Sequence, residues 1–177
     1  MAVLCEAISV VVRADRLLET FEDFYAFKDT VPNETLAADD EVVRVGFMDP
    51  DDAKSFVNAL EERGLVYQDN GKARDLVVID QITGLLFPCD WVEFGKIPMQ
   101  DQEVGAARLV GSNLNQLVTP EGWELEGSLT QTYTVVPRKR SALSRLKFSR
   151  SENGVSVYLD ERTGKELFLG RATKSDE

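Results

Sequence analysis

The stretch VVRVGFMDPDDAKSFVNALEERGL, residues 42–65, decides the fold. Its opening segment, VVRVGF, is rich in β-branched residues and is typical of a buried strand. Asp49 then supplies a helix N-cap, and Pro50 suits the first helical position because the N–H that it lacks would have no partner there. Apolar side chains recur at helical spacing as far as Gly64, which can adopt the left-handed conformation that ends many helices. The sequence therefore predicts a strand that runs straight into a helix over about 50–63.

An earlier copy of this strand-and-helix pattern lies near the N-terminus. Residues 8–12 are mostly β-branched and predict a strand, and residues 15–25 carry apolar side chains at helical spacing. Between the two copies, NETLAADDEVVRV reads as a short strand, an acidic turn and a strand. After the second helix, Asn70-Gly71 predicts a hairpin turn before a strand over 75–80. The predicted order of elements is β-α-β-β-α-β with an added strand.

This order predicts an α+β fold in which a ferredoxin-like, split β-α-β antiparallel sheet carries two helices on one face. A pair of βαβββ modules uses nearly the same elements and stays open as an alternative. We expect residues 1–82 to form this part and residues 83–177 to form a β-rich part packed against it. No flexible linker rich in Gly, Ser or Pro separates the two, so we expect one continuous globular unit.

The β-rich part shows strands and turns without a convincing helix. Residues 155–159 and 166–169 predict a hairpin, and residues 129–136 alternate loosely like a strand. Residues 95–104 and 111–127 are read as loops.

The composition excludes several kinds of chemistry. The 43% hydrophobic and 29% charged residues are typical of a globular chain. The sequence contains no histidine, so Ser-His-Asp and Cys-His catalytic systems are excluded in their usual form, and two cysteines cannot complete a zinc site. The glycine-rich phosphate-binding motifs GxGxxG and GxxxxGK[ST] are absent as well. We therefore expect neither a metal nor a cofactor.

The cysteines and the N-terminal segment predict a cytoplasmic protein. The apolar N-terminal stretch has no basic segment before it and contains Glu6, so it does not resemble a signal peptide. No apolar run approaches the roughly 20 residues that a membrane helix needs. Cys5 and Cys89 are too few for a disulfide scaffold, and we expect both to be reduced thiols.

The distribution of charge gives the leading hypothesis for function. The net charge of −11 lies entirely within residues 1–100, because acidic and basic side chains balance over the rest of the chain. An acidic surface repels nucleic acid and steers cationic partners toward itself, although solubility alone also explains such a charge. We predict a non-catalytic, acidic protein-binding module, like an immunity or antitoxin protein that neutralises a basic partner. The residues assigned to the partner surface are Asp39, Asp40, Glu41, Glu61, Glu62 and Asp69.

The stretch LLFPCDWVEF, residues 85–94, suggests two alternative functions. Asp90 follows Cys89, and its charge opposes the thiolate that a nucleophile needs, so the cysteine is better explained as a small core residue. One alternative is a small-molecule-binding regulatory domain, and the other is an enzyme that uses carboxylates or the cysteine. The residues assigned to a ligand cleft are Cys89, Asp90, Trp91, Glu93 and Trp123.

Residues 137–150 form a basic segment with six basic side chains and no acidic one. Arg138, Lys139 and Arg140 are candidates for contact with an anion. The acidic background disfavours nucleic acid, so we expect the segment to dock on the acidic part of this chain or on a second copy of it.

Overall fold

The computed structural model describes residues 1–112, 116–134, 146–152, 155–160 and 166–169. The fold is a mixed α+β fold with several sheets, mostly antiparallel, and few helices. Of the helices in these residues, none is long and apolar enough to cross a membrane.

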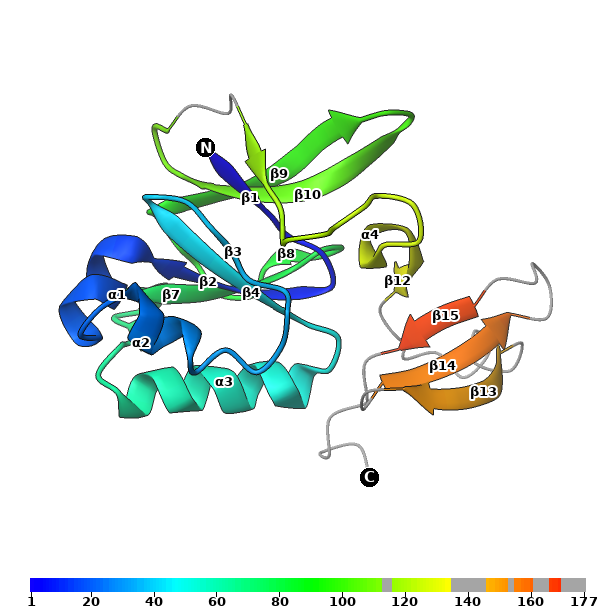
Figure 1. The fold of residues 1–177 in the computed structure, drawn as a ribbon, viewed down its shortest axis with the longest axis horizontal. Coiled ribbons are helices and arrows are strands. Elements are labelled where there is room, and N and C mark those ends of the chain that lie inside the picture. The colour runs from blue at the N-terminus through cyan, green and yellow to red at the C-terminus, as the bar shows by residue number, and fades with distance from the viewer. Residues whose placement is uncertain (113–115, 135–145, 153–154, 161–165, 170–177) are drawn as a thin grey trace.

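A five-stranded sheet forms the middle layer, and every neighbouring pair of its strands is antiparallel. Its strands, in spatial order, are β3 (Ala37–Ala38), β4 (Val42–Phe47), β2 (Ile8–Arg13), β7 (Leu76–Asp80) and β8 (Gly84–Leu85). One face of this central sheet is covered by α1 (Ala14–Thr20), α2 (Phe24–Lys28) and α3 (Pro50–Glu62) (Figure 1).

A second sheet covers the other face of the central sheet (Figure 1). Its strands, in spatial order, are β11 (Leu117–Val118), β1 (Ala2–Leu4), β10 (Gln102–Leu109) and β9 (Val92–Met99). The N-terminal strand β1 is internal in this sheet, parallel to β11 and antiparallel to β10. The second sheet therefore combines the start of the chain with segments about a hundred residues later.

Two further sheets complete the described structure. The first is a hairpin of β5 (Gln68–Asp69) and β6 (Lys72–Ala73). A single helical turn, α4 (Leu129–Thr132), leads into the second, whose spatial order is β12-β15-β14-β13. These strands are β12 (Tyr133–Thr134), β13 (Leu146–Glu152), β14 (Val155–Asp160) and β15 (Glu166–Leu169).

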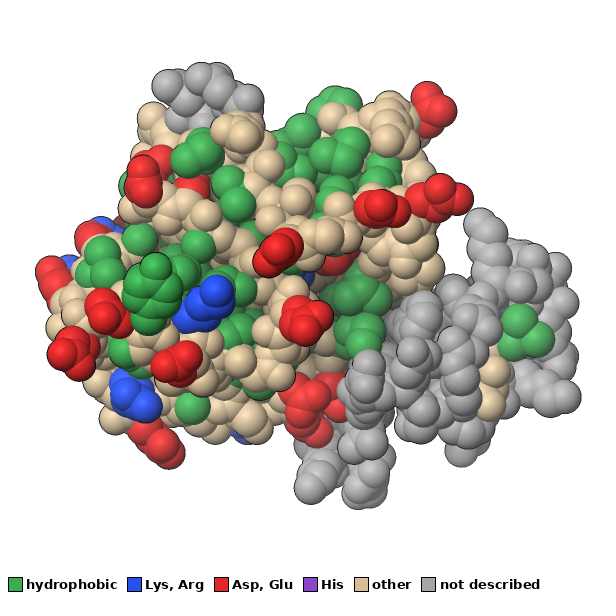
Figure 2. Space-filling view, in the orientation of Figure 1, with side chains coloured by type: hydrophobic (Ala, Val, Ile, Leu, Met, Phe, Trp, Pro, Cys, Tyr) green, Lys and Arg blue, Asp and Glu red, His purple; other side chains and the backbone are tan. Residues whose placement is uncertain are grey.

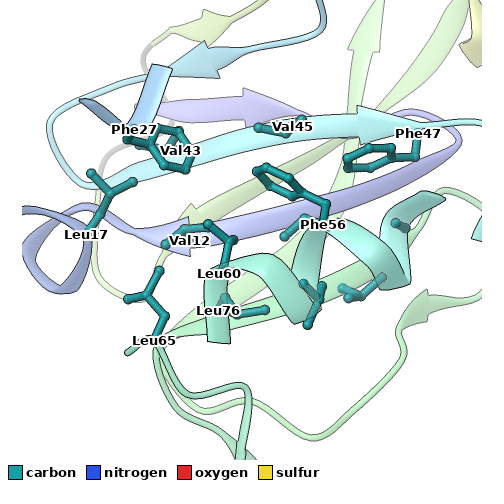
Figure 3. Packing of buried hydrophobic residues seen from close by; sticks show 14 of the residues in the cluster. Val12, Leu17, Phe27, Val43, Val45, Phe47, Phe56, Leu60, Leu65 and Leu76 are labelled. Atoms are coloured by element: carbon teal, nitrogen blue, oxygen red, sulfur yellow. The ribbon is translucent and has the colours of Figure 1, made fainter. Parts of the chain in front are cut away.

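Side chains of the central sheet alternate between two apolar clusters. Val10 and Val12 of β2 pack in the cluster on the helix side, whereas Val11 packs in the cluster shared with the second sheet. Figure 3 shows Phe56 and Leu60 of α3 pointing toward the sheet in the first cluster. Both faces of β2 are buried, so this strand has almost no exposed side.

The predicted helix over 50–63 is confirmed by α3. It begins at Pro50, and the Asp49 side chain accepts the Asp51 N–H at 2.8 Å. Gly64 follows the helix with a φ of 115°, in the left-handed region. The predicted hairpin of 155–159 with 166–169 is confirmed too, since β14 and β15 are antiparallel neighbours.

The single helix predicted over 15–25 is wrong, because two short helices occupy this segment. The backbone is extended at Phe21, which ends α1. Asp23 then caps α2 by accepting the Ala26 N–H at 2.8 Å. This side-chain hydrogen bond competes with a continuous helix and favours a new start.

The loop predicted over 95–104 is also wrong. Strands β9 and β10 pair along their whole length and turn at Gln100, whose φ is 55°. Pro98 is tolerated in β9 because β9 is an edge strand, where a missing N–H breaks no ladder hydrogen bond. The strand predicted over 129–136 is wrong for residues 129–132, which form the helical turn α4, whereas residues 133–134 are strand β12 and residues 135–136 lie outside the described residues. The loop predicted over 111–127 is wrong at Leu117–Val118, which form β11 by pairing with β1.

Candidate functional site

The acidic residues assigned to a partner surface lie on three segments that contact α1 or the residue after it. The Ala14 N–H donates to the Glu41 carbonyl at 3.0 Å, so the β3–β4 turn lies at the start of α1. The C-terminal end of α3 also lies against α1, because the Arg63 guanidinium sits 5.3 Å from the centre of the Phe21 ring that follows α1. We call this surface the acidic end; its residues are Asp39, Asp40, Glu41, Glu61, Glu62 and Asp69.

Asp69 reaches this end through a chain of ion pairs. Arg74 lies 3.7 Å from Asp69 and 3.5 Å from Asp75. Asp75 also lies 3.6 Å from Arg16 of α1. The β5–β6 hairpin is thus tied to α1, although the two are distant in the sequence.

Only part of this acidic end carries uncompensated charge. Asp39 holds its own turn, because its Oδ1 accepts the N–H groups of Glu41 and Val42 at 2.7 Å each. By contrast, Asp40, Glu61 and Glu62 are exposed, and they have no ion-pair or hydrogen-bond partner among the described residues. The outward-facing negative charge is therefore concentrated in these three carboxylates.

Helices α1 and α2 place apolar side chains beside these charges. Leu18 is 56% exposed and Tyr25 is 72% exposed. Figure 2 shows hydrophobic side chains gathered over α1 and α2 with acidic side chains around them. Tyrosine is a frequent anchor of protein interfaces, because its rigid ring buries a large area at little cost in conformational entropy.

A separate cleft of about 840 Å³ lies at the opposite, N-terminal end of α3. The loop 30–35 forms one wall, the first half of α3 forms the other, and the end of β4 lies between them. Its apolar lining includes Pro32, Phe47, Phe56 and Leu129. Its acidic lining consists of Glu34, Asp49 and Asp52.

Arg44 of β4 lies at the base of this cleft and is only 1% exposed. Its Nε donates to Ser9 Oγ at 2.9 Å, its Nη1 to the Thr35 carbonyl at 3.1 Å and its Nη2 to the Glu6 carbonyl at 2.9 Å. Burial lowers the pKa of this guanidinium. A Cβ at Gly46 would overlap Nη2, so glycine at this position is what allows the guanidinium to lie there.

The buried Glu6 carboxylate fastens the segment before β12 to the body of the protein. Its Oε1 accepts the Trp123 Nε1–H at 3.1 Å. Its Oε2 accepts the Thr130 N–H at 3.0 Å and the Thr130 hydroxyl at 2.9 Å. Gln81 donates to the Thr130 carbonyl at 2.8 Å and completes the attachment. These contacts are structural, and they keep α4 beside the cleft.

The environment of Cys89 disfavours a reactive thiol. Its side chain is half-buried and packs against the cluster between the two large sheets. Burial raises the pKa of the thiol, and the charge of Asp90 raises it further. Asp90 itself is exposed and forms an ion pair with Lys72 at 3.1 Å.

The other residues assigned to a ligand cleft have separate structural roles. Trp91 is buried, and its Nε1–H donates to the Ala73 carbonyl at 3.0 Å. Glu93 forms a cross-strand ion pair with Arg108 at 2.9 Å. Trp123 packs against a third apolar cluster, away from that of Trp91. None of the five lines the cleft beside α3. Arg138, Lys139 and Arg140 lie outside the described residues.

Cys5 gives a prediction about alkaline stability. Burial raises the pKa of its thiol to about 11, although the charge of Arg44 lowers it somewhat. The pKa in the unfolded chain is about 8.5, so the folded state holds this proton more tightly. The resulting stability is fully present below about pH 8.5 and is lost as the pH rises toward 11, by up to about 1.4 kcal/mol per pH unit.

The free energy of unfolding in urea, measured for the wild type and for Cys5→Ala at several pH values between about 8.5 and about 11, checks this prediction. The variant is expected to lose less stability than the wild type with rising pH. Parallel curves for the two proteins would contradict it.

Among the described residues, no group of three or more Cys, Asp or Glu side chains is arranged to hold a metal ion. Comparisons with protein-family models, with curated proteins and with solved structures find no match to this chain.

Proposed function

We propose that this chain is a non-catalytic binding module whose acidic end holds a basic partner protein, in the manner of a neutralising immunity or antitoxin protein. The observation that supports this most is that Asp40, Glu61 and Glu62 are exposed and uncompensated among the described residues, on segments that contact the two ends of α1. Helices α1 and α2 themselves expose Leu18 and Tyr25. An apolar anchor within a charged rim is the arrangement that many protein interfaces use.

The two parts of this surface have different roles in binding. The carboxylates steer a basic partner during diffusion and raise the association rate, an effect that salt weakens. Tyr25 becomes buried in the complex and slows dissociation, because its contacts are lost when the partner leaves.

The state of the cysteines favours binding over catalysis. Burial raises the pKa of both Cys5 and Cys89, so neither thiol is prepared to act as a thiolate nucleophile near neutral pH. Both thiols are free, which fits the reducing cytoplasm that we propose as the location.

We also propose a ferredoxin-like, split β-α-β description for the helical part of the fold. The order β3-β4-β2-β7 and the position of α1 after β2 and α3 after β4 support it. The edge strand β8 is an addition to that arrangement.

A capture experiment with paired charge-reversal variants tests the proposed function. The double variant Glu61→Lys/Glu62→Lys reverses two charges at the acidic end. The control Glu124→Lys/Glu126→Lys makes the same change of net charge on exposed residues of the loop before α4. We expect wild type and control to retain the same basic protein from cell extract, more strongly at about 50 mM than at about 200 mM salt, and the acidic-end variant to lose it.

The affinity of the purified partner for a Tyr25 variant then tests whether Tyr25 is an anchor. Tyr25→Ala is expected to weaken its affinity by about 30-fold, because an interface anchor contributes about 2 kcal/mol, while stability changes by less than about 0.5 kcal/mol. Equal retention by all variants, or an unchanged affinity for Tyr25→Ala, would show that the acidic end is not the binding surface.

A further inference from the structure

We propose that the cleft beside the N-terminal half of α3 binds a small organic monocation with an aliphatic tail, such as an alkylamine or an alkylguanidine, as a free molecule. This site is separate from the acidic end, which involves the other end of α3, so the inference goes beyond the proposed function. It rests on the shape of the cleft, its apolar walls and the placement of its charges.

The size of the cleft favours a free ligand. Its volume of about 840 Å³ lies within the range of roughly 300–1,000 Å³ that is usual for small-molecule sites.

The wall formed by loop 30–35 is held in place before any ligand arrives. Asn33 Nδ2 donates to the Gly46 carbonyl at 2.7 Å. The Gly46 N–H donates to Thr35 Oγ1 at 2.6 Å, and the Thr35 carbonyl accepts from Arg44 at 3.1 Å. A wall fixed in this way lowers the entropy that binding would otherwise cost.

The apolar lining fits an aliphatic tail. Phe47 at the end of β4 and Phe56 on α3 pack together with ring centres 5.4 Å apart. Pro32 from the loop and Leu129 from α4 extend this surface on other sides. Removing an alkyl chain from water against such walls is favourable, and the gain grows with each methylene group that becomes buried.

The acidic lining fits one positive charge. Glu34 lies on the loop and Asp52 on α3, so the two carboxylates come from opposite walls. Both are exposed, and neither has an ion-pair or hydrogen-bond partner within the part of the chain that the structure describes. A cationic head group between these walls would be attracted by both carboxylates, whereas an anion would be repelled.

Arg44 sets the polarity of the ligand along the cleft. Its guanidinium lies at the base, where its positive charge disfavours a second cationic group. The ligand is therefore expected to place its charged end at Glu34 and Asp52 and an apolar end toward the base. A linear diamine of the same length should bind less well than the monoamine.

Titration of the full chain with hexylammonium, followed by calorimetry and by backbone amide NMR, tests this proposal. Hexanoate, hexanol and the linear six-carbon diamine are the charge controls. We expect hexylammonium to bind with a Kd of about 1 mM or tighter, at least about fivefold more tightly than each control, and to shift amide signals of loop 30–35 and α3.

Matched variants distinguish the cleft from general attraction to an acidic protein. Glu34→Gln and Asp52→Asn are each expected to weaken hexylammonium binding by about fivefold. Asp51→Asn makes the same charge change in the same helical turn, but Asp51 does not line the cleft, so it should have little effect. Far-ultraviolet circular dichroism and urea unfolding establish that each variant is folded.

Three results would each overturn the proposal: no binding of hexylammonium, equal binding of hexanoate, or equal weakening by Asp51→Asn. If capture of a basic protein depends on Asp52 while hexylammonium does not bind, the cleft receives a side chain of that partner and not a free ligand. These variants leave the acidic end unchanged, so the cleft proposal can fail while the proposed partner surface stands. Likewise, the partner surface can fail while the cleft proposal stands.

Discussion

Replacing Gly46 with alanine is expected to lower the free energy of unfolding by about 3 kcal/mol, a large effect for a single added methyl group. The new Cβ would overlap Nη2 of Arg44, so the buried guanidinium must move. Movement breaks its hydrogen bonds to Ser9, Thr35 and Glu6, and a hydrogen bond that involves a charged group contributes about 1.5–3 kcal/mol. Urea unfolding of the wild type and the variant measures the change.

A double-mutant cycle isolates the cause of this effect. In an Arg44→Met background the guanidinium is absent, so Gly46→Ala should cost less than about 1 kcal/mol. The expected coupling between the two positions is therefore about 2 kcal/mol. If Gly46→Ala costs the same in both backgrounds, the contact between Gly46 and Arg44 does not explain the need for glycine.

Replacing Phe27 with alanine is expected to lower the free energy of unfolding by about 3–5 kcal/mol. This ring is fully buried and lies at the centre of an aromatic group, with ring centres 5.5 Å from Phe21, 6.2 Å from Phe24 and 6.4 Å from Phe56. Its loss leaves a cavity where α1, α2 and α3 meet the sheet, and the surrounding rings can close it only in part.

Tyr25→Ala is the matched control, because it removes an aromatic ring from the same short helix at a position that is 72% exposed. Denaturant unfolding of both variants should show a change below about 0.5 kcal/mol for Tyr25→Ala. Similar losses for the two variants would mean that α2 does not pack as described.

The elements predicted best from the sequence were those with local signals at both ends. Asp49, Pro50 and Gly64 mark the limits of α3, and the apolar spacing between them fixes its buried face. Strands β2 and β4 also follow from local pattern, since both are nearly continuous apolar runs.

Elsewhere the sequence pattern predicted the wrong element, either because a local hydrogen bond competed with it or because one face of the element is exposed. The spacing over 15–25 fits one helix, but the capping hydrogen bond of Asp23 starts a new one. The β9–β10 hairpin leaves one of its faces largely exposed, so its pattern resembles that of a loop. Its place in the second sheet depends on the pairing of β10 with β1, a segment about a hundred residues earlier that no short window of sequence reveals.

The candidate sites depend on tertiary structure in the same way. The residues of the acidic end were chosen for their charge, but only the tertiary structure brings the β3–β4 turn to the start of α1 and the end of α3 to the residue that follows α1. The cleft was not predicted at all. Its one local signal was Arg44 in an otherwise apolar strand with a glycine two positions later, a pattern that favours a buried, hydrogen-bonded charge.

The internal position of β1 has a consequence for biosynthesis. Its three side chains are fully buried, yet both of its neighbours, β10 and β11, are translated about a hundred residues later. At about 5–20 residues per second, the ribosome needs on the order of 5–20 s to supply them. During that interval the apolar side chains of β1 lack their strand partners, and we expect chaperones that act at the ribosomal exit to bind this segment.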